Sequence, residues 1–374
     1  MIIKRLIQDD IEKLIFKGKI IIIYGPRQVG KTTLIKQIEK KYEDISLYLN
    51  CDEPDIKEIF SKTSTEIRSF FGQKKLILID EAQQIKDIGH SLKLMVDSIP
   101  DIQIIATGSS SFELSEKVIE PLTGRKYEFI LYPLSILELR SLYSDIEIKR
   151  LVGQFIIYGM YPEIQLASEN RSRNLISIAN SYSYKNVLKF QNIKNPDVLE
   201  KLLKALALQI GNQVSYNELA EITGVDKNTV SNYIRILEKA FIIYRLTPFS
   251  MNLRNEIKKL NKIYFIDTGI RNALINNLNS FDLRNDVGNL WENFWINERI
   301  KYLRYKNIQS NTYFWRTKQS QEIDFIEEYA NEIKAYELKW NSNKLKVPSS
   351  FSENYKNSKI NLVNRENFLD FLTH

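Results

Sequence analysis

Cysteine and histidine are nearly absent from this chain of 374 residues, which has one cysteine, Cys51, and two histidines, His90 and His374. A single cysteine cannot form a disulfide within the chain, and this usage fits a reducing, cytoplasmic location. One cysteine and two histidines are also too few for a zinc finger or a histidine-based nuclease or protease site. Any hydrolytic chemistry is therefore expected to depend on carboxylates, lysine and Mg2+.

Long apolar runs are missing as well. No stretch approaches the ~20 residues that a membrane helix needs, so no membrane partner is expected. The segment 1–7 is too short, and too soon charged at Lys4 and Arg5, for a secretory signal. Hydrophobic residues nevertheless make up 43% of the chain, which is enough for two or three domains with real cores.

The first part of the chain lacks a net charge. Residues 1–150 carry 23 Lys and Arg against 23 Asp and Glu, so residues 151–374, with 30 against 23, hold the whole excess of +7. A basic excess suggests a polyanionic partner for the second part. Ordinary solubilising charge is the alternative, and the composition leaves both open.

A phosphate-binding loop is the clearest motif present. The sequence GPRQVGKT fits the pattern G-x-x-x-x-G-K-[ST], between the apolar run Ile20–Tyr24 and the helix-like segment Thr32–Lys41. Backbone N–H groups of such a loop approach phosphate oxygens, and the helix directs its positive end at the same anion. Lys31 is expected to reach the β- and γ-phosphates of ATP, and the Thr32 hydroxyl to ligate Mg2+. The expected nucleotide-binding residues are Gly25, Pro26, Arg27, Gln28, Val29, Gly30, Lys31, Thr32 and Thr33.

Strand-like and helix-like segments alternate through residues 1–135. This alternation predicts a parallel sheet with helices on both faces, in which ligands bind at the carboxyl ends of the strands. The expected strands are residues 20–24, 46–50, 76–80, 102–107 and 127–132.

The strand predicted over residues 76–80 ends in two acids, Asp80 and Glu81. Asp80 is expected to hold the Mg2+ shell, and Glu81 to polarise the attacking water as general base. Such a pair can also mark an ordinary turn. Its position, one strand–helix unit after the phosphate loop, favours the functional interpretation.

Other candidate catalytic side chains follow in the chain. Thr107 and Ser109, at the end of the fourth predicted strand, could hydrogen-bond the γ-phosphate or the water, or could belong to a serine-rich turn. Arg125 could supply positive charge to the ATP of a neighbouring subunit, or could be a surface arginine.

The chain resembles the AAA+ superfamily, and most of all the archaeal-type ATPases that carry a C-terminal domain of unknown function, number 4143. The resemblance is carried by the segments GPRQVGKTTL, LILIDEAQ, ATGSSSFELS, LTGRKYEFILYPLS and YGMYPE, and it continues into YFIDTGIRNAL and WRTKQSQEIDF. It implies ATP hydrolysis and assembly into a homo-oligomer.

The middle of the chain predicts a helical lid over residues 136–196 and a winged helix-turn-helix over residues 197–252. Two helical segments, 216–224 and 225–237, meet at a glycine and have apolar residues at helical spacing. The second helix would present groove-reading side chain types to DNA. The alternative is a winged helix that only packs against the ATPase core or another subunit. The candidate DNA contacts are Lys227, Asn228, Thr229, Asn232 and Arg235.

Residues 253–374 predict a small α/β domain with a carboxylate–lysine constellation. Glu292 lies on a helix, Asp324 on a strand, and Glu337 and Lys339 on the same face of the next strand. Two carboxylates can hold Mg2+ while an ammonium orients water. The arrangement resembles that of PD-(D/E)xK nucleases. A charged strand face, or a nuclease fold without activity, is the alternative.

The sequence as a whole therefore predicts an α/β protein: an AAA+ parallel sheet over 1–135, then lid, winged helix and nuclease-like domain. The preferred function is an Mg2+-dependent ATPase that acts on or binds DNA, with a possible metal-dependent nuclease. A nucleotide-dependent switch that controls assembly, with an inactive nuclease-like domain, is the alternative from another class. A DNA-binding regulator whose oligomeric state responds to ATP is a third.

Overall fold

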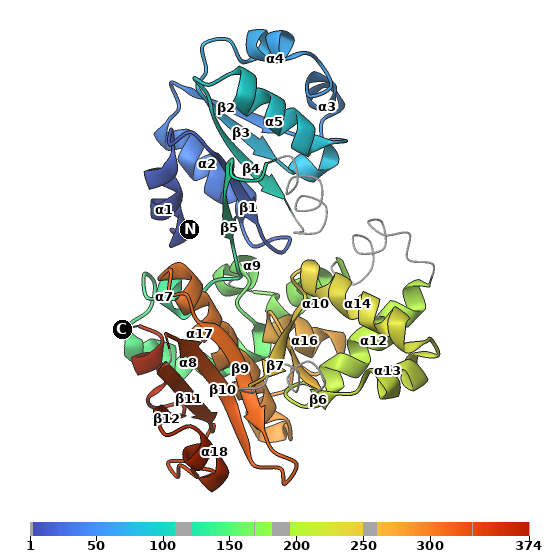
Figure 1. Cartoon of the computed structure of the whole chain (residues 1–374), viewed down its shortest axis with the longest axis vertical. Helices are drawn as coiled ribbons and strands as arrows, with labels where there is room; N and C mark the ends of the chain where they lie inside the picture. Colours follow the sequence, from blue (N-terminus) through green and yellow to red (C-terminus); the bar gives the residue numbers. More distant parts are fainter. Residues whose placement is uncertain are drawn as a thin grey trace. The chain divides into compact units, whose positions relative to one another are not determined.

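The computed structural model of the protein describes residues 3–108, 122–167, 169–181, 195–249, 260–330 and 332–373. The chain forms two compact units (Figure 1). Unit 1 contains Met1–Pro133 and the short segment Lys239–Phe241, and unit 2 contains Leu134–Glu238 and Ile242–His374. None of the described helices is both long and apolar enough to cross a membrane.

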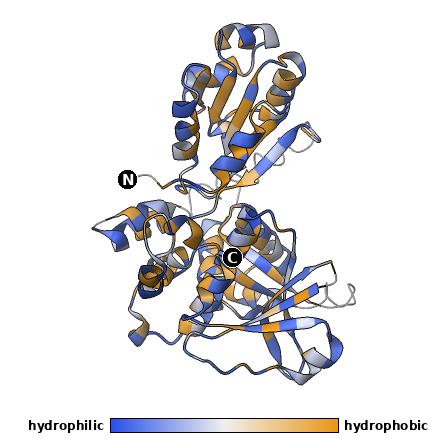
Figure 2. Ribbon diagram, turned by 90° about the vertical axis from the view of Figure 1, so that its left-hand side faces the viewer, coloured by the Kyte–Doolittle hydropathy of each residue, from blue (hydrophilic) through white to orange (hydrophobic). Residues whose placement is uncertain are grey.

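Unit 1 is built on a five-stranded parallel sheet in the order β2-β3-β4-β1-β5. Every residue of β1 and β3 is buried, as the unbroken apolar runs predict for central parallel strands. Figure 2 shows these strands coloured as hydrophobic. The strands are β1 (Ile20–Tyr24), β2 (Ser46–Asn50), β3 (Leu76–Asp80), β4 (Gln103–Gly108) and β5 (Lys126–Ile130).

Helices connect the strands of unit 1, and the predicted α/β class is confirmed. β1, β2 and β3 have the predicted bounds, whereas β4 begins one residue later and β5 one residue earlier than predicted. The helical elements are α1 (Ile7–Leu14), α2 (Lys31–Lys41), α3 (Pro54–Ile59), α4 (Ser64–Phe71), η1 (Ala82–Gln84) and α5 (Ile88–Ser98).

Unit 2 begins with helices, as predicted for this stretch. Two of them start with capping boxes, in which Ser135 and Ser144 each accept a hydrogen bond from the backbone of a glutamate three residues later. Residues 182–194 lie outside the described part. The helices are α7 (Ile136–Leu139), α8 (Asp145–Tyr158), α9 (Pro162–Leu166) and α10 (Arg171–Ser181).

The next part of unit 2 combines three helices with three antiparallel strands. Strands β6, β7 and β8 pair in the order β7-β8-β6, with β7 antiparallel to β8 and β8 antiparallel to β6. The elements are α12 (Pro196–Leu208), β6 (Gln213–Val214), α13 (Tyr216–Thr223), α14 (Lys227–Lys239), β7 (Ile243–Pro248) and β8 (Asn261–Phe265).

A seven-stranded sheet, in the order β12-β11-β10-β9-β7-β8-β6, runs through the rest of unit 2. β7 pairs in parallel with β9, so this sheet continues across the predicted boundary at residue 252. The four-part division of the chain stays a prediction. The remaining elements are α16 (Thr268–Leu274), η3 (Phe281–Leu283), α17 (Val287–Tyr305), β9 (Asn311–Arg316), β10 (Glu322–Tyr329), β11 (Glu332–Leu338), α18 (Ser349–Asn354), β12 (Ser358–Val363) and η4 (Phe368–Phe371).

Helix α17 is the central support of unit 2, because nearly its whole circumference is buried. Its polar side chains are satisfied inside the core. Asn293 and Asn297 each donate a hydrogen bond of 2.7 Å to the carbonyl of Phe265, and Arg299 pairs with the Glu327 carboxylate at 2.5 Å. The helix therefore fixes β8 and β10 by specific bonds as well as by apolar packing.

Candidate functional site

The phosphate loop joins β1 to α2, and its glycines have the backbone geometry that the motif requires. Gly30 precedes α2 with φ of 95°, and Gly25 has φ of 155°. A Cβ atom on Gly25 would overlap the carbonyl oxygen of Leu131. These two positions therefore need glycine for different reasons, a left-handed conformation at Gly30 and a close backbone approach at Gly25.

Lys31 folds back over this loop. Its side chain ammonium donates hydrogen bonds of 3.0 Å to the Gly25 carbonyl and 2.7 Å to the Pro26 carbonyl, and the residue is only 5% exposed. Burial lowers the pKa of Lys31 to about 8, although the carboxylates of Glu81 and Asp80 oppose this effect. Among the described residues, the hydrogen-bond partners of this buried cation are two carbonyl oxygens, and a phosphate group would satisfy it better.

The Asp80 carboxylate accepts hydrogen bonds from several residues near the ends of the strands. It accepts hydrogen bonds of 2.7 Å from the Thr32 hydroxyl and 2.9 Å from the Tyr48 hydroxyl, and a further one from Thr107. The Thr32 hydroxyl and the Asp80 carboxylate are hard oxygen ligands already in contact, so these residues fit Mg2+. Tyr48 was not predicted, because nothing in its own strand sequence marks a contact with Asp80.

Glu81 lies just beyond the end of β3 in a left-handed conformation, with φ of 53°. Its backbone N–H donates to the Asp80 carboxylate and to the Thr107 hydroxyl, both at 3.2 Å. Gln83 donates a hydrogen bond to the Glu81 carboxylate. This geometry fixes the direction of the Glu81 side chain, as a general base requires.

Arg5 contacts the phosphate loop, and this contact was not predicted from the sequence. Its guanidinium is 4% exposed and donates hydrogen bonds of 2.6 Å to the carbonyls of Val29 and Tyr132. Arg5 thereby ties the phosphate loop to the segment that follows β5. It precedes every strand of the sheet, so no motif spacing could have indicated this role.

The remaining predicted residues of unit 1 have varied surroundings. Val29 is fully buried, whereas Gln28, Thr32 and Thr33 are exposed. Arg27 is half-buried, and its charge contributes to the lowered pKa of Lys31, after the larger effect of burial.

Arg125 forms an ion pair of 2.9 Å with Asp97, and both side chains are more than two-fifths exposed, at 43% and 42%. Arg125 thus lies on the surface of unit 1, which leaves its predicted role untested. Ser109 lies outside the described residues.

The four candidate nuclease residues come together in unit 2, with a cation between them. The Lys262 ammonium, on β8, lies 2.8 Å from the Glu292 carboxylate and also pairs with Glu322. Lys339 lies 2.7 Å from the Glu337 carboxylate and 4.0 Å from Asp324. Lys262 and Glu322 were not predicted, because neither belongs to the Glu-x-Lys pattern.

Burial governs the titration of this cluster. It raises the pKa of Glu292 to about 7, an effect that Lys262 opposes and Asp324 reinforces. Burial also raises the pKa of Asp324 and of Glu337. The pKa of Lys262 is raised despite its burial, because the carboxylates of Glu292, Asp324 and Glu322 stabilise the charged form.

A divalent metal does not fit this cluster as it stands. Lys262 is 1% exposed and pairs with Glu292 and Glu322, while Lys339 pairs with Glu337, so the cluster already holds two cations beside its carboxylates. Among the described residues, no group of three or more His, Cys, Asp or Glu side chains could hold a metal ion.

The candidate DNA contacts lie on α14. Lys227, Asn228, Asn232 and Arg235 are exposed, and Thr229 is half-exposed, whereas the apolar residues of the helix are buried. Asp226 caps the helix by accepting hydrogen bonds from the backbone of Asn228 at 2.8 Å and of Thr229 at 3.1 Å. The polar face of α14 is therefore open to solvent along its length.

Three family models match the chain in succession. Residues 17–140 match an AAA domain, residues 149–280 match the domain of unknown function DUF8612, and residues 287–369 match the domain of unknown function DUF4143.

Relatives of similar length occur in archaea and bacteria. An uncharacterized protein of Methanocaldococcus jannaschii is 25% identical over 98% of this chain and 90% of its own length. An uncharacterized protein of Mycobacterium tuberculosis is 25% identical over 88% of this chain and 72% of its own.

Solved structures overlap this chain less closely. A Walker-type ATPase of Pyrococcus abyssi matches with a TM-score of 0.49 and 16% identity, over 73% of this chain and 96% of its own. The Holliday junction branch migration motor RuvB of Thermotoga maritima matches with a TM-score of 0.33 and 16% identity, over 65% of this chain and 90% of its own.

The low pKa of Lys31 predicts that ATP binding takes up a proton in alkaline solution. With a pKa of about 8 in the free protein, Lys31 loses its charge as the pH rises through 8, and a bound triphosphate restores that charge. Calorimetry in buffers of different ionisation enthalpy should detect almost no proton uptake at pH 6.5 and close to one proton at pH 9. Affinity should fall above pH 8. Equal proton uptake at both pH values would contradict this account of Lys31.

Proposed function

We propose that this chain, which belongs to the AAA-type ATPases that carry a C-terminal DUF4143 domain, binds ATP with Mg2+ at the phosphate loop and hydrolyses it. The observation that carries this proposal is the contact between the two motifs. Thr32, at the start of the helix after the loop, hydrogen-bonds Asp80 at the end of β3.

Each residue at this edge of the sheet has a role in the proposal. Lys31 leaves the loop carbonyls and holds the β- and γ-phosphates, which supply the anion that its buried ammonium lacks. Thr32 and Asp80 hold the Mg2+, whose chemistry is to neutralise phosphate charge. Glu81 accepts a proton from the attacking water, and Gln83 orients the Glu81 carboxylate. Thr107 keeps the Asp80 carboxylate in place.

Two substitutions separate binding from hydrolysis. Glu81→Gln removes the base but keeps the shape, so it should lower turnover by about 100-fold or more while ATP stays bound. Lys31→Ala should abolish both binding and turnover. Phosphate release and nucleotide retention on a gel-filtration column measure the two effects, and Lys40→Ala, at an exposed position of the same helix, is the control. Turnover by Glu81→Gln at the rate of the parent chain would rule out this site.

DNA is the partner that we propose for α14. The arrangement of α12, α13, α14 and the strands β6 to β8 supports a winged helix, with α14 as its recognition helix. The exposed polar face of α14 and the basic excess of residues 151–374 support a polyanionic partner. The alternative is that this face packs against another copy in the proposed homo-oligomer. Such packing would not require the face to be basic.

Charge removal on α14 tests the proposed DNA contact. The double substitution Lys227→Gln and Arg235→Gln should weaken duplex binding and reduce the slope of log affinity against log salt by about 2, one for each lost phosphate contact. Lys201→Gln with Lys204→Gln removes the same charge from α12 and serves as the control. Fluorescence anisotropy at several salt concentrations measures both. Equal slopes for the two double variants would exclude α14 as the contact.

The nuclease-like cluster favours the second candidate function, a nucleotide-dependent switch with an inactive nuclease-like domain. Lys262 pairs with Glu292 and Glu322, and Lys339 pairs with Glu337, so these lysines supply positive charge that a divalent ion would otherwise supply. A metal-dependent nuclease would first have to displace a buried, doubly paired ammonium.

Cleavage assays distinguish an inactive nuclease-like domain from an active one. With Mg2+ or Mn2+, the parent chain and Asp324→Ala should leave single- and double-stranded DNA equally intact. Lys262→Met removes the internal cation and should raise Mn2+ affinity, which electron paramagnetic resonance measures directly. Circular dichroism verifies that the variant is folded. Metal-dependent cleavage by the parent chain that Asp324→Ala removes would restore the nuclease hypothesis.

A further inference from the structure

Unit 2 contains a cavity of about 390 Å³ that none of the motifs explains. One wall is α8, which contributes Lys149, Arg150 and Gly153, and the other is formed by Trp340, after β11, and by the turn after β12. The volume lies within the range of about 300–1,000 Å³ that small-molecule sites occupy. The cavity shares no residue with the phosphate loop or with the carboxylate–lysine cluster.

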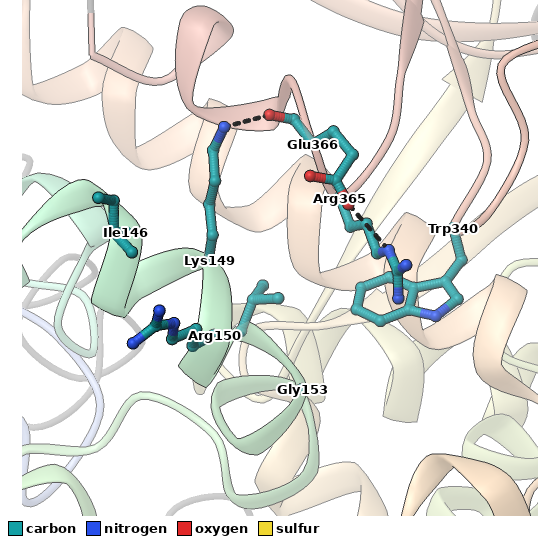
Figure 3. A pocket seen from close by; sticks show the side chains of 8 residues that line it. Ile146, Lys149, Arg150, Gly153, Trp340, Arg365 and Glu366 are labelled. Atoms are coloured by element: carbon teal, nitrogen blue, oxygen red, sulfur yellow. Dashed lines mark hydrogen bonds and ion pairs between the residues drawn. The ribbon is translucent and has the colours of Figure 1, made fainter.

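Positive charge dominates the lining. Lys149, Arg150 and Arg365 face a single carboxylate, that of Glu366, which lies 3.1 Å from the Arg365 guanidinium. Lys149 donates to the backbone carbonyl of Glu366, as Figure 3 shows, and forms no ion pair with any described residue. Arg150 makes neither a hydrogen bond nor an ion pair within the described part of the chain. The lining therefore keeps an excess of two positive charges that an anion could neutralise.

A rigid aromatic platform accompanies these cations. The Trp340 ring packs edge-on against Trp291 and Phe281, with centroids 5.3 Å and 4.9 Å apart. The Arg365 guanidinium lies 5.9 Å from the centre of the Trp340 ring (Figure 3). An arginine beside a tryptophan ring can bind a phosphate while the ring stacks with a planar group.

Gly153 lines the cavity, and its lack of a side chain leaves the cavity open at this point. It lies in the middle of α8, where glycine costs roughly 0.5–1 kcal/mol relative to alanine. Neither backbone geometry nor packing requires it, because its φ is not positive and a Cβ atom there would have no neighbour within 4 Å. A side chain at this position would instead enter the cavity, so glycine there preserves the volume.

We propose that this cavity binds a nucleotide, whose base stacks at Trp340 and whose phosphate pairs with Lys149 and Arg365. The ligand is either a free nucleotide or one nucleotide of a single strand, since both offer a planar base beside a phosphate. The site does not depend on the proposed ATPase activity, because its residues lie in unit 2 alone.

Binding assays on the full-length chain carrying Lys31→Ala test this site without interference from the phosphate loop. The probes are AMP and a fluorescein-labelled oligo-dT of about ten nucleotides. Gly153→Leu fills the cavity and should weaken binding at least about tenfold, the loss expected when one base no longer stacks. Gly288→Leu is the matched control, because Gly288 is also helical and also has open space at its Cβ position.

A second pair of variants guards against misfolding. Arg365→Gln changes an exposed side chain and should also weaken binding, whereas Lys359→Gln, on β12, should not. Binding of AMP indicates a free nucleotide, and binding of the oligonucleotide alone indicates a strand. Absence of binding by both probes, or equal binding by Gly153→Leu and Gly288→Leu, would overturn the proposal.

Discussion

The buried ammonium of Lys31 is the constraint on which the phosphate loop depends. It lies among carbonyl oxygens, at a position where burial disfavours its charge. Two contacts hold the shape of the loop. Gly25 passes close to Leu131, and Arg5, which lies outside the loop in the sequence, donates a hydrogen bond to the Val29 carbonyl. A bound triphosphate would place full negative charge beside this ammonium and offset the unfavourable effect of burial.

Unit 2 also contains a buried lysine, but its charge is stabilised by partners within the chain. One of its buried cations, Lys262, has carboxylate partners within the chain. The same residue types that suggest a metal site in the sequence form ion pairs with lysines in the structure. Lys31 and Lys262 are both almost fully buried, yet the pKa of the first is lowered and that of the second is raised. The difference lies in the partners, which are carbonyl oxygens for Lys31 and carboxylates for Lys262.

The sequence predicted the features that depend on contiguous residues. The phosphate loop, the apolar strand that ends at Asp80 and the exposed polar face of α14 could all be read from spacing, because local periodicity fixes them. Contacts between distant segments could not be read in this way. Arg5 reaches Val29 across 24 positions, and Lys262 meets Glu292 across 30. The cavity at Trp340 was missed for the same reason, since three separate segments line it.

The central claim is that a magnesium–nucleotide complex occupies the loop between β1 and α2. Equilibrium dialysis of a non-hydrolysable ATP analogue, with Mg2+ and again with EDTA, tests it most directly. The account predicts saturable binding by the parent chain that weakens strongly in EDTA, and equally strongly in Thr32→Ala with Mg2+ present. Binding that is indifferent to both Mg2+ and Thr32, or no saturable binding at all, would contradict it.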